Sequence, residues 1–193
     1  MNTTNYILEL LISGISSFIW LFLFSLSILG TDTLGLVNYL DDKDRIIIAF
    51  LVLPIIYTFG VLIDRLVDNV FDKFFNLKLR KKFFKNENLY REARSNIYIN
   101  SVSLTNLFEY GRIRIRISRN WTFNGLLIYI SSIIFLWTST FSNLSFIGKW
   151  KYTIVISFIL IPSIFLAYNS WKSLNKKEYN FLKIQNNIFN KRN

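Results

Sequence analysis

IIIAFLVLPIIYTFGVLI, at residues 46–63, is followed directly by DRLVDNVFDKFF at residues 64–75. The first segment has 18 residues without Asp, Glu, Lys or Arg, which is enough for a helix to cross the hydrocarbon core of a membrane. The second segment keeps apolar residues at helical spacing and adds an Asp at every fourth position. We therefore predict one helix that crosses a membrane and continues to about residue 77 outside it.

Three further runs lack charged residues, and each is long enough to span a membrane: residues 10–31, 120–148 and 152–171, with 22, 29 and 20 residues. We expect an all-α integral membrane protein that forms a single domain over residues 1–193. Its transmembrane helices are predicted at about residues 8–30, 46–63, 120–142 and 152–171, with the second and third extended into the cytoplasm. A cytoplasmic loop at 64–119 and a cytoplasmic tail at 172–193 complete the chain, and the tail is predicted to be an amphipathic helix.

Lys and Arg are distributed unevenly among the connecting segments. The loop at 64–119 contains thirteen and the tail six, whereas the two loops on the opposite side contain two each. Basic residues are retained on the cytoplasmic side of membranes, so both termini are predicted to be cytoplasmic. The composition, rich in Asn, Ile, Lys and Phe, favours a prokaryotic origin, and hence a bacterial inner membrane.

The chain contains neither Cys nor His. Disulfides and thiol nucleophiles are excluded, as are the commonest zinc ligand and the commonest general base. We expect no catalytic residue, no metal and no cofactor, and hence no enzyme. The net charge of +11 is assigned to anionic lipid headgroups on the cytoplasmic side. Nucleic acid is not an expected partner, because no nucleic-acid-binding module accompanies the charge.

Two rows of charge at helical spacing flank the long loop. They comprise three carboxylates and three guanidinium groups: Asp64, Asp68, Asp72, Arg112, Arg116 and Arg119. If both segments are helical and antiparallel, the predicted ion pairs are Arg119–Asp64, Arg116–Asp68 and Arg112–Asp72. The alternative is a strand at 111–118, where Arg and Ile alternate. We interpret this set either as a charge latch at a cytoplasmic mouth or as a clamp that fixes helix register.

A further basic cluster, interleaved with apolar residues, is a candidate for contact with the lipid surface. It consists of Lys78, Arg80, Lys81, Lys82, Phe83, Phe84 and Lys85. The alternative is a solvated run that only sets topology. Pro54 and Pro162 lie inside the second and fourth spans, where proline bends a helix; each is either a hinge for gating or a static bend.

The spans contain few polar side chains, and we expect these to form hydrogen bonds between helices. They include Ser13, Ser16, Ser17 and Asn124. Glu9 stands at the start of the first span, where it is predicted to pair with Arg65 or Arg119.

No motif in the sequence states a function, so the expected function follows from architecture. In outline the chain is similar to the small multi-span effectors of bacterial antiviral defence systems. This resemblance implies a homo-oligomeric pore-forming or membrane-disrupting effector, controlled through its basic loop and tail by a cytoplasmic sensor or signal protein. The alternatives are a non-catalytic scaffold or regulatory subunit of a membrane complex and, with least support, a lipid-processing membrane enzyme.

Overall fold

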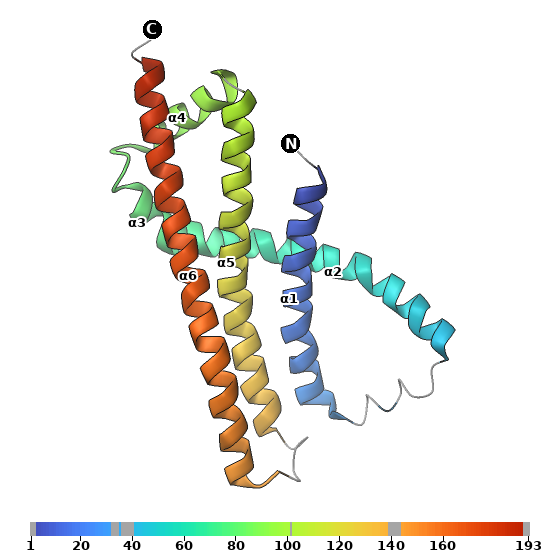
Figure 1. Cartoon of the computed structure of the whole chain (residues 1–193). Helices are drawn as coiled ribbons and strands as arrows, with labels where there is room; N and C mark the ends of the chain where they lie inside the picture. Colours follow the sequence, from blue (N-terminus) through green and yellow to red (C-terminus); the bar gives the residue numbers. More distant parts are fainter. Residues whose placement is uncertain (1–2, 32–34, 36–40, 101, 139–143, 191–193) are drawn as a thin grey trace.

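The computed structural model describes residues 3–31, 35, 41–100, 102–138 and 144–190 (Figure 1). The helices are α1 (Thr3–Leu29), α2 (Asp42–Phe71), α3 (Leu77–Arg80), α4 (Glu87–Asn100), α5 (Val102–Trp137) and α6 (Phe146–Asn190). A π-helical segment, Asp72–Asn76, joins α2 to α3. No strand occurs in these ranges, so residues 111–118 are helical and the alternative of a strand is excluded.

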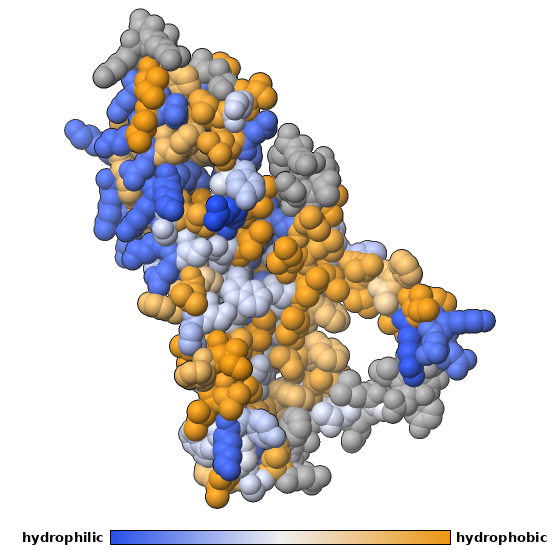
Figure 2. Space-filling view, in the orientation of Figure 1, coloured by the Kyte–Doolittle hydropathy of each residue, from blue (hydrophilic) through white to orange (hydrophobic). Residues whose placement is uncertain are grey.

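Four helices in the described ranges are long and apolar enough to cross a membrane: Ile7–Leu29, Asp42–Arg80, Val102–Trp137 and Phe146–Phe189. This confirms the all-helical class and the predicted number of apolar helices. Large apolar side chains remain exposed along α2 and α6, and they cover much of the surface in Figure 2. An apolar surface of this extent is typical of helices that face lipid or other helices, and it supports a multi-pass membrane protein.

Local sequence explains where α1 ends and where α6 begins. Gly30 follows α1 with a φ of 85°, a conformation that favours glycine, and its N–H donates to the Leu26 carbonyl at 3.0 Å. Ser145 precedes α6, and its hydroxyl oxygen accepts a hydrogen bond from the Gly148 N–H at 3.2 Å. Both contacts satisfy backbone groups that a helix end leaves unpaired.

Helices α1, α5 and α6 lie side by side (Figure 1). α1 and α5 run in the same direction, and α6 runs in the opposite direction. Two indole N–H groups of α5 donate to hydroxyls of α6: Trp121 to Ser163 at 3.0 Å and Trp137 to Thr153 at 3.1 Å. These bonds hold α5 and α6 together at both ends of their apolar segments.

Both prolines lie inside continuous helices, and their role as hinges stays a prediction. α2 continues through Pro54, whose carbonyl accepts a hydrogen bond from the Thr58 hydroxyl at 2.8 Å. α6 continues through Pro162, so the predicted tail helix is the last part of the fourth helix and not a separate element. Residues 191–193 of the predicted tail and residues 139–142 of the predicted third span lie outside the described residues.

α2 does not lie parallel to the other long helices but crosses behind α1, α5 and α6 (Figure 1). At its crossing with α1 the two backbones touch. A Cβ added to Gly14 would lie 2.0 Å from the Ile56 carbonyl oxygen, and one added to Gly60 would lie 2.1 Å from that of Leu10. Beyond this point α2 packs on α5 and α6 through a buried cluster of Val67, Phe71, Ile115 and Trp171.

Candidate functional site

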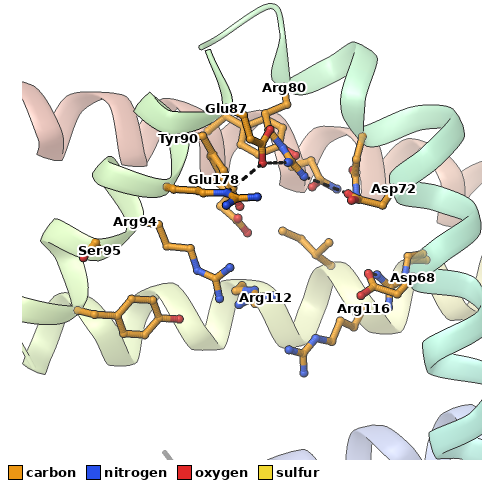
Figure 3. Close-up of a pocket in the computed structure, with 17 residues that line it drawn as sticks. Asp68, Asp72, Arg80, Glu87, Tyr90, Arg94, Ser95, Arg112, Arg116 and Glu178 are labelled. Carbon is orange, nitrogen blue, oxygen red and sulfur yellow. Dashed lines mark hydrogen bonds and ion pairs between the residues drawn. The ribbon is translucent and has the colours of Figure 1, made fainter. Parts of the chain in front are cut away.

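A polar cavity of about 620 Å³ lies between α2 and what we call the charged end, which comprises α3, α4, residues 102–118 of α5 and residues 172–189 of α6 (Figure 3). Six arginines, four carboxylates and three tyrosines dominate its lining: Asp68, Asp72, Arg80, Glu87, Tyr90, Arg91, Arg94, Tyr98, Arg112, Arg116, Arg119, Glu178 and Tyr179. Such a concentration of guanidinium groups in one cavity makes it the candidate functional site.

An apolar cluster beside the cavity fixes the helices that carry these side chains. It joins α3, α4, α5 and α6 through Leu79, Phe84, Ala93, Ile97, Phe108, Tyr179 and Leu182. On α4, Ala93 and Ile97 are fully buried in this cluster, one turn apart. The neighbouring positions Tyr90 and Arg94 are thereby held at the cavity wall.

Arg80 is bound on three sides at one wall of the cavity. Its guanidinium donates to Asp72 at 3.0 Å and to Glu87 at 2.6 Å, and it lies 4.6 Å from the centre of the Tyr90 ring. The π-helical segment between Asp72 and Arg80 supports this contact, because Asn76 also donates to Asp72, at 3.2 Å. Arg80 therefore holds α3 and α4 against the end of α2.

The predicted pairing of Arg119 with Asp64 is present. Arg119 is buried, and its guanidinium donates to Asp64 at 2.8 Å and also contacts Asp68. The predicted Arg116–Asp68 and Arg112–Asp72 pairs are wrong. The reason is that α2 crosses α5 instead of running alongside it. Arg119 therefore contacts both Asp64 and Asp68, whereas Asp72 lies beyond the crossing and binds Arg80 of α3.

The two remaining arginines of that row have other partners. Arg116 contacts the buried carboxylate of Glu9, with 3.5 Å between Nη1 and Oε2. The prediction that Glu9 pairs with Arg65 or Arg119 is therefore wrong: the partner is Arg116, which lies on the same face of α5 as Arg119. Arg112 lies 4.0 Å from Glu109, one turn earlier in its own helix.

Arg94 and Arg112 point toward the same part of the cavity from α4 and α5 (Figure 3). Among the described residues no carboxylate lies within 4.0 Å of the Arg94 guanidinium. Glu178 faces both arginines from α6, beyond the charge-free run that ends at Trp171. Burial raises the pKa of Glu178 to about 7, while the charges of Arg112 and Arg94 act in the opposite direction.

A chain of buried polar side chains leads from Arg119 into the apolar part of the molecule, and we call it the polar seam. It lies between α1, α2 and α5 and contains Ser13, Ser16, Ser17, Asp64, Arg119, Asn120 and Asn124, of which all but the half-buried Asp64 are buried. Asn120 donates to Asp64 at 3.0 Å and to Ser13 at 3.1 Å.

One turn farther along α5, Asn124 continues the polar seam. It is fully buried; its amide N–H₂ donates to Ser16 at 2.8 Å, and its amide oxygen accepts from Ser17 at 3.2 Å. Trp20 also donates to this oxygen, at 3.3 Å. The prediction that these polar side chains form hydrogen bonds between helices is confirmed, and the structure shows that the helices they join are α1 and α5.

The predicted lipid-contact cluster divides into two groups. The lysines Lys78, Lys81, Lys82 and Lys85 are exposed. Phe84 is buried in the apolar cluster, Phe83 packs against it, and Arg80 is committed to its carboxylates. Exposed apolar side chains close to these lysines in the sequence are instead Phe74, Phe75 and Leu77.

Sequence reasoning missed the cavity because its lining comes from five helices and the π-helical segment. Arg80 had been assigned to the lipid surface, and Arg94 and Glu178 belong to no periodic row of charge. The described residues contain no group of His, Cys, Asp or Glu that could hold a metal ion. Guanidinium groups bind carboxylates and phosphates through paired N–H donors, so the chemistry available in the cavity is anion binding. Comparison with protein-family models, with curated proteins and with solved structures finds no match to this chain.

Proposed function

We propose that this chain is a bacterial inner-membrane effector that permeabilises the membrane under control of its charged end, which lies on the cytoplasmic side. The observation that carries the proposal is the polar seam, which connects a residue of the cavity wall to side chains inside the apolar segments. Polar groups within a membrane are costly, and they commonly mark a functional path. The orientation follows from the excess of Lys and Arg in the charged end.

The contacts of the polar seam support control from the cavity. Arg119 lines the cavity and binds Asp64, and Asp64 accepts a hydrogen bond from Asn120. A rearrangement of the cavity wall that moves Arg119 therefore changes the contacts between α1, α2 and α5. If α1 separates from α5, the hydrogen bonds of Ser13, Asn120 and Asn124 break. Their polar groups then line the gap between the two helices, and such a polar surface admits water.

Self-association with a second copy of the chain is part of the proposal. The first half of α2 projects away from the other helices in Figure 2, with its apolar side chains exposed. Ile46, Phe50 and Leu51 have exposed fractions of 58%, 69% and 64%. A second copy can cover this arm by packing helix against helix. An assembly of several copies also provides more helices to line a pore than the four of one chain.

One observation favours a second candidate, a non-catalytic scaffold. Both the amide nitrogen and the amide oxygen of Asn124 are already hydrogen-bonded, as they are in polar contacts that only hold helices together. In that case the polar seam fixes the bundle, and the exposed arm of α2 binds another membrane protein. The two candidates differ in whether the purified protein makes a membrane leak.

The test is dye release from proteoliposomes that contain wild-type protein, Asp68→Arg, or the double variant Asp68→Arg/Arg119→Asp. The single change places two cations together where Arg119 now holds α2, so we expect faster release than from wild type. The double variant restores attraction between positions 68 and 119 but leaves Asp64 beside a second carboxylate, so we expect it to reduce the leak only in part. Asp42→Arg is the matched control, since the Asp42–Arg45 pair is exposed and lies at the far end of α2.

A leak that appears with Asp68→Arg, falls with the charge exchange and stays at the wild-type rate with Asp42→Arg supports the effector. Absence of release from all four proteins, with insertion confirmed by protease protection, rejects the effector and leaves the scaffold. Disulfide cross-linking through an Ile47→Cys variant tests self-association, because the natural chain has no Cys.

A further inference from the structure

Two of the six cavity arginines, Arg94 and Arg112, form no close ion pair among the described residues. Arg80 binds Asp72 and Glu87, Arg119 binds Asp64 and Asp68, Arg116 contacts Glu9, and Arg91 lies 3.9 Å from Glu87. No described carboxylate lies within 4.0 Å of the Arg94 guanidinium, and Arg112 lies 4.0 Å from Glu109; Glu178 faces both arginines without a close ion pair.

We propose that Arg94 and Arg112 bind a phosphate group of a small phosphorylated ligand inside the cavity. Two guanidinium groups that converge on one space repel each other, and Glu178, which faces both, forms no close ion pair with either. Phosphate suits this place, because each guanidinium offers paired N–H donors that match two of its oxygens. Figure 3 shows both side chains directed into the cavity from different helices.

Aromatic rings hold the two arginines in place before any ligand arrives. The Arg94 guanidinium carbon lies 5.6 Å from the centre of the Tyr98 ring, and that of Arg112 lies 5.9 Å from the centre of the Phe108 ring. The Tyr98 ring in turn packs edge-on against Phe108, with 5.9 Å between centres. A preorganised pair loses little side-chain entropy on binding, which favours affinity.

The size of the cavity indicates more than an inorganic ion. Its volume of about 620 Å³ lies within the range of sites for small molecules and cofactors. Tyr90 and Tyr98 also line it, beneath the guanidinium groups of Arg80 and Arg94. A soluble phosphorylated compound of nucleotide size meets this description, and the phosphate of an anionic lipid headgroup has the same binding chemistry.

Glu178 makes binding depend on pH. The groups that face it are Arg80, Tyr90, Arg94, Glu109, Arg112 and Tyr179. An anion bound at Arg94 and Arg112 is repelled by the ionised Glu178 and not by the protonated form, so binding takes up a proton. Because the pKa of Glu178 is about 7, we expect tighter binding at pH 6 than at pH 8.

Calorimetric titration of the full chain in phosphatidylcholine nanodiscs tests the site, with pyrophosphate and ATP as probes. We expect saturable binding that Arg94→Gln or Arg112→Gln weakens about tenfold or more, since each removes a charge-assisted hydrogen-bonding group. Glu178→Gln is expected to strengthen binding, a gain that misfolding cannot imitate. Arg65→Gln is the matched control: it removes one positive charge from an exposed position outside the cavity lining.

A second titration uses sulfate, whose charge does not change between pH 6 and pH 8. Tighter binding at pH 6 is expected for wild type, and no such difference for Glu178→Gln. Nanodiscs that contain phosphatidylglycerol then identify the source of the phosphate. Weaker pyrophosphate binding in these discs, lost with Arg94→Gln, assigns the site to a lipid headgroup, and unchanged binding assigns it to a soluble compound.

Absence of binding by pyrophosphate, ATP and sulfate, together with no effect of phosphatidylglycerol, overturns the inference. Equal losses for Arg65→Gln and Arg94→Gln also overturn it, because they would show attraction to overall charge alone. The inference rests on the proposed function only for its consequence, that the ligand triggers the leak. Binding without dye release would reject the effector and retain the site.

Discussion

The polar seam and the charged end both contain buried polar groups, but they use them differently. In the polar seam, Asn124 and Asn120 are hydrogen-bonded to residues of a neighbouring helix. In the charged end, Arg94 and Arg112 point into a cavity and form no ion pair closer than 4.0 Å with a described carboxylate. Polar groups that are hydrogen-bonded to each other hold helices together, whereas charged groups that face a cavity without a close ion pair can bind a ligand of opposite charge.

The strongest test of this comparison is Arg119→Gln, at the upper end of the polar seam. The change leaves the mostly buried Asp64 carboxylate without its counter-charge, so we expect a loss of about 3 kcal/mol in the free energy of unfolding. Denaturant unfolding in detergent micelles measures it. Arg45→Gln, in an exposed pair, serves as control, and a similar loss there would show that Arg119 has no special role.

Gly60→Ala tests whether the close crossing of α1 and α2 keeps the polar seam assembled. The added methyl would lie 2.1 Å from the Leu10 carbonyl oxygen, and the helices must separate to admit it. We expect destabilisation by about 1–3 kcal/mol, seen as a lower midpoint of thermal unfolding. Gly111→Ala has free space around its Cβ and should instead stabilise α5 by about 0.5–1 kcal/mol. Equal shifts would contradict the tight crossing.

Asn124→Leu removes the central member of the polar seam and should have a smaller effect. Hydrogen bonds between membrane helices contribute about 0.6 kcal/mol on average, and Ser16 and Ser17 keep their bonds to the Ser13 carbonyl. We expect a loss of that order in denaturant unfolding. In the dye-release assay, Asp68→Arg/Asn124→Leu should leak less than Asp68→Arg, and an undiminished leak would separate permeation from the polar seam.

Arg94→Gln should have the smallest effect on stability, although it is the same substitution as Arg119→Gln. Arg94 contacts the rings of Tyr98 and Phe108 and faces Glu178 without a close ion pair, so we expect a change in unfolding free energy of no more than about 1 kcal/mol. The paired measurement sharpens the comparison directly. If Arg94 and Arg119 contribute equally to stability, the arginines of the cavity stabilise the fold and are not available to bind a ligand.

The sequence predicted the elements better than their arrangement. Charge-free runs identified four apolar helices, and helical spacing of Asp and Arg led to the contact of Arg119 with Asp64. The other two pairs failed because charge spacing does not report a crossing angle, which close packing at Gly14 and Gly60 determines. The cavity could not be predicted from the sequence, because Arg94 and Glu178 come together only when α4 packs on α6.

The close crossing at Gly60 also has a mechanical consequence. The helix from Asp42 to Arg80 is continuous over 39 residues, and Gly60 lies near its middle. At 1.5 Å per residue, each half is about 30 Å long, so the helix is a lever with nearly equal arms and its fulcrum on α1. A small tilt at Asp72 and Arg80, where the cavity lies, therefore swings the far arm by a similar distance in the opposite sense.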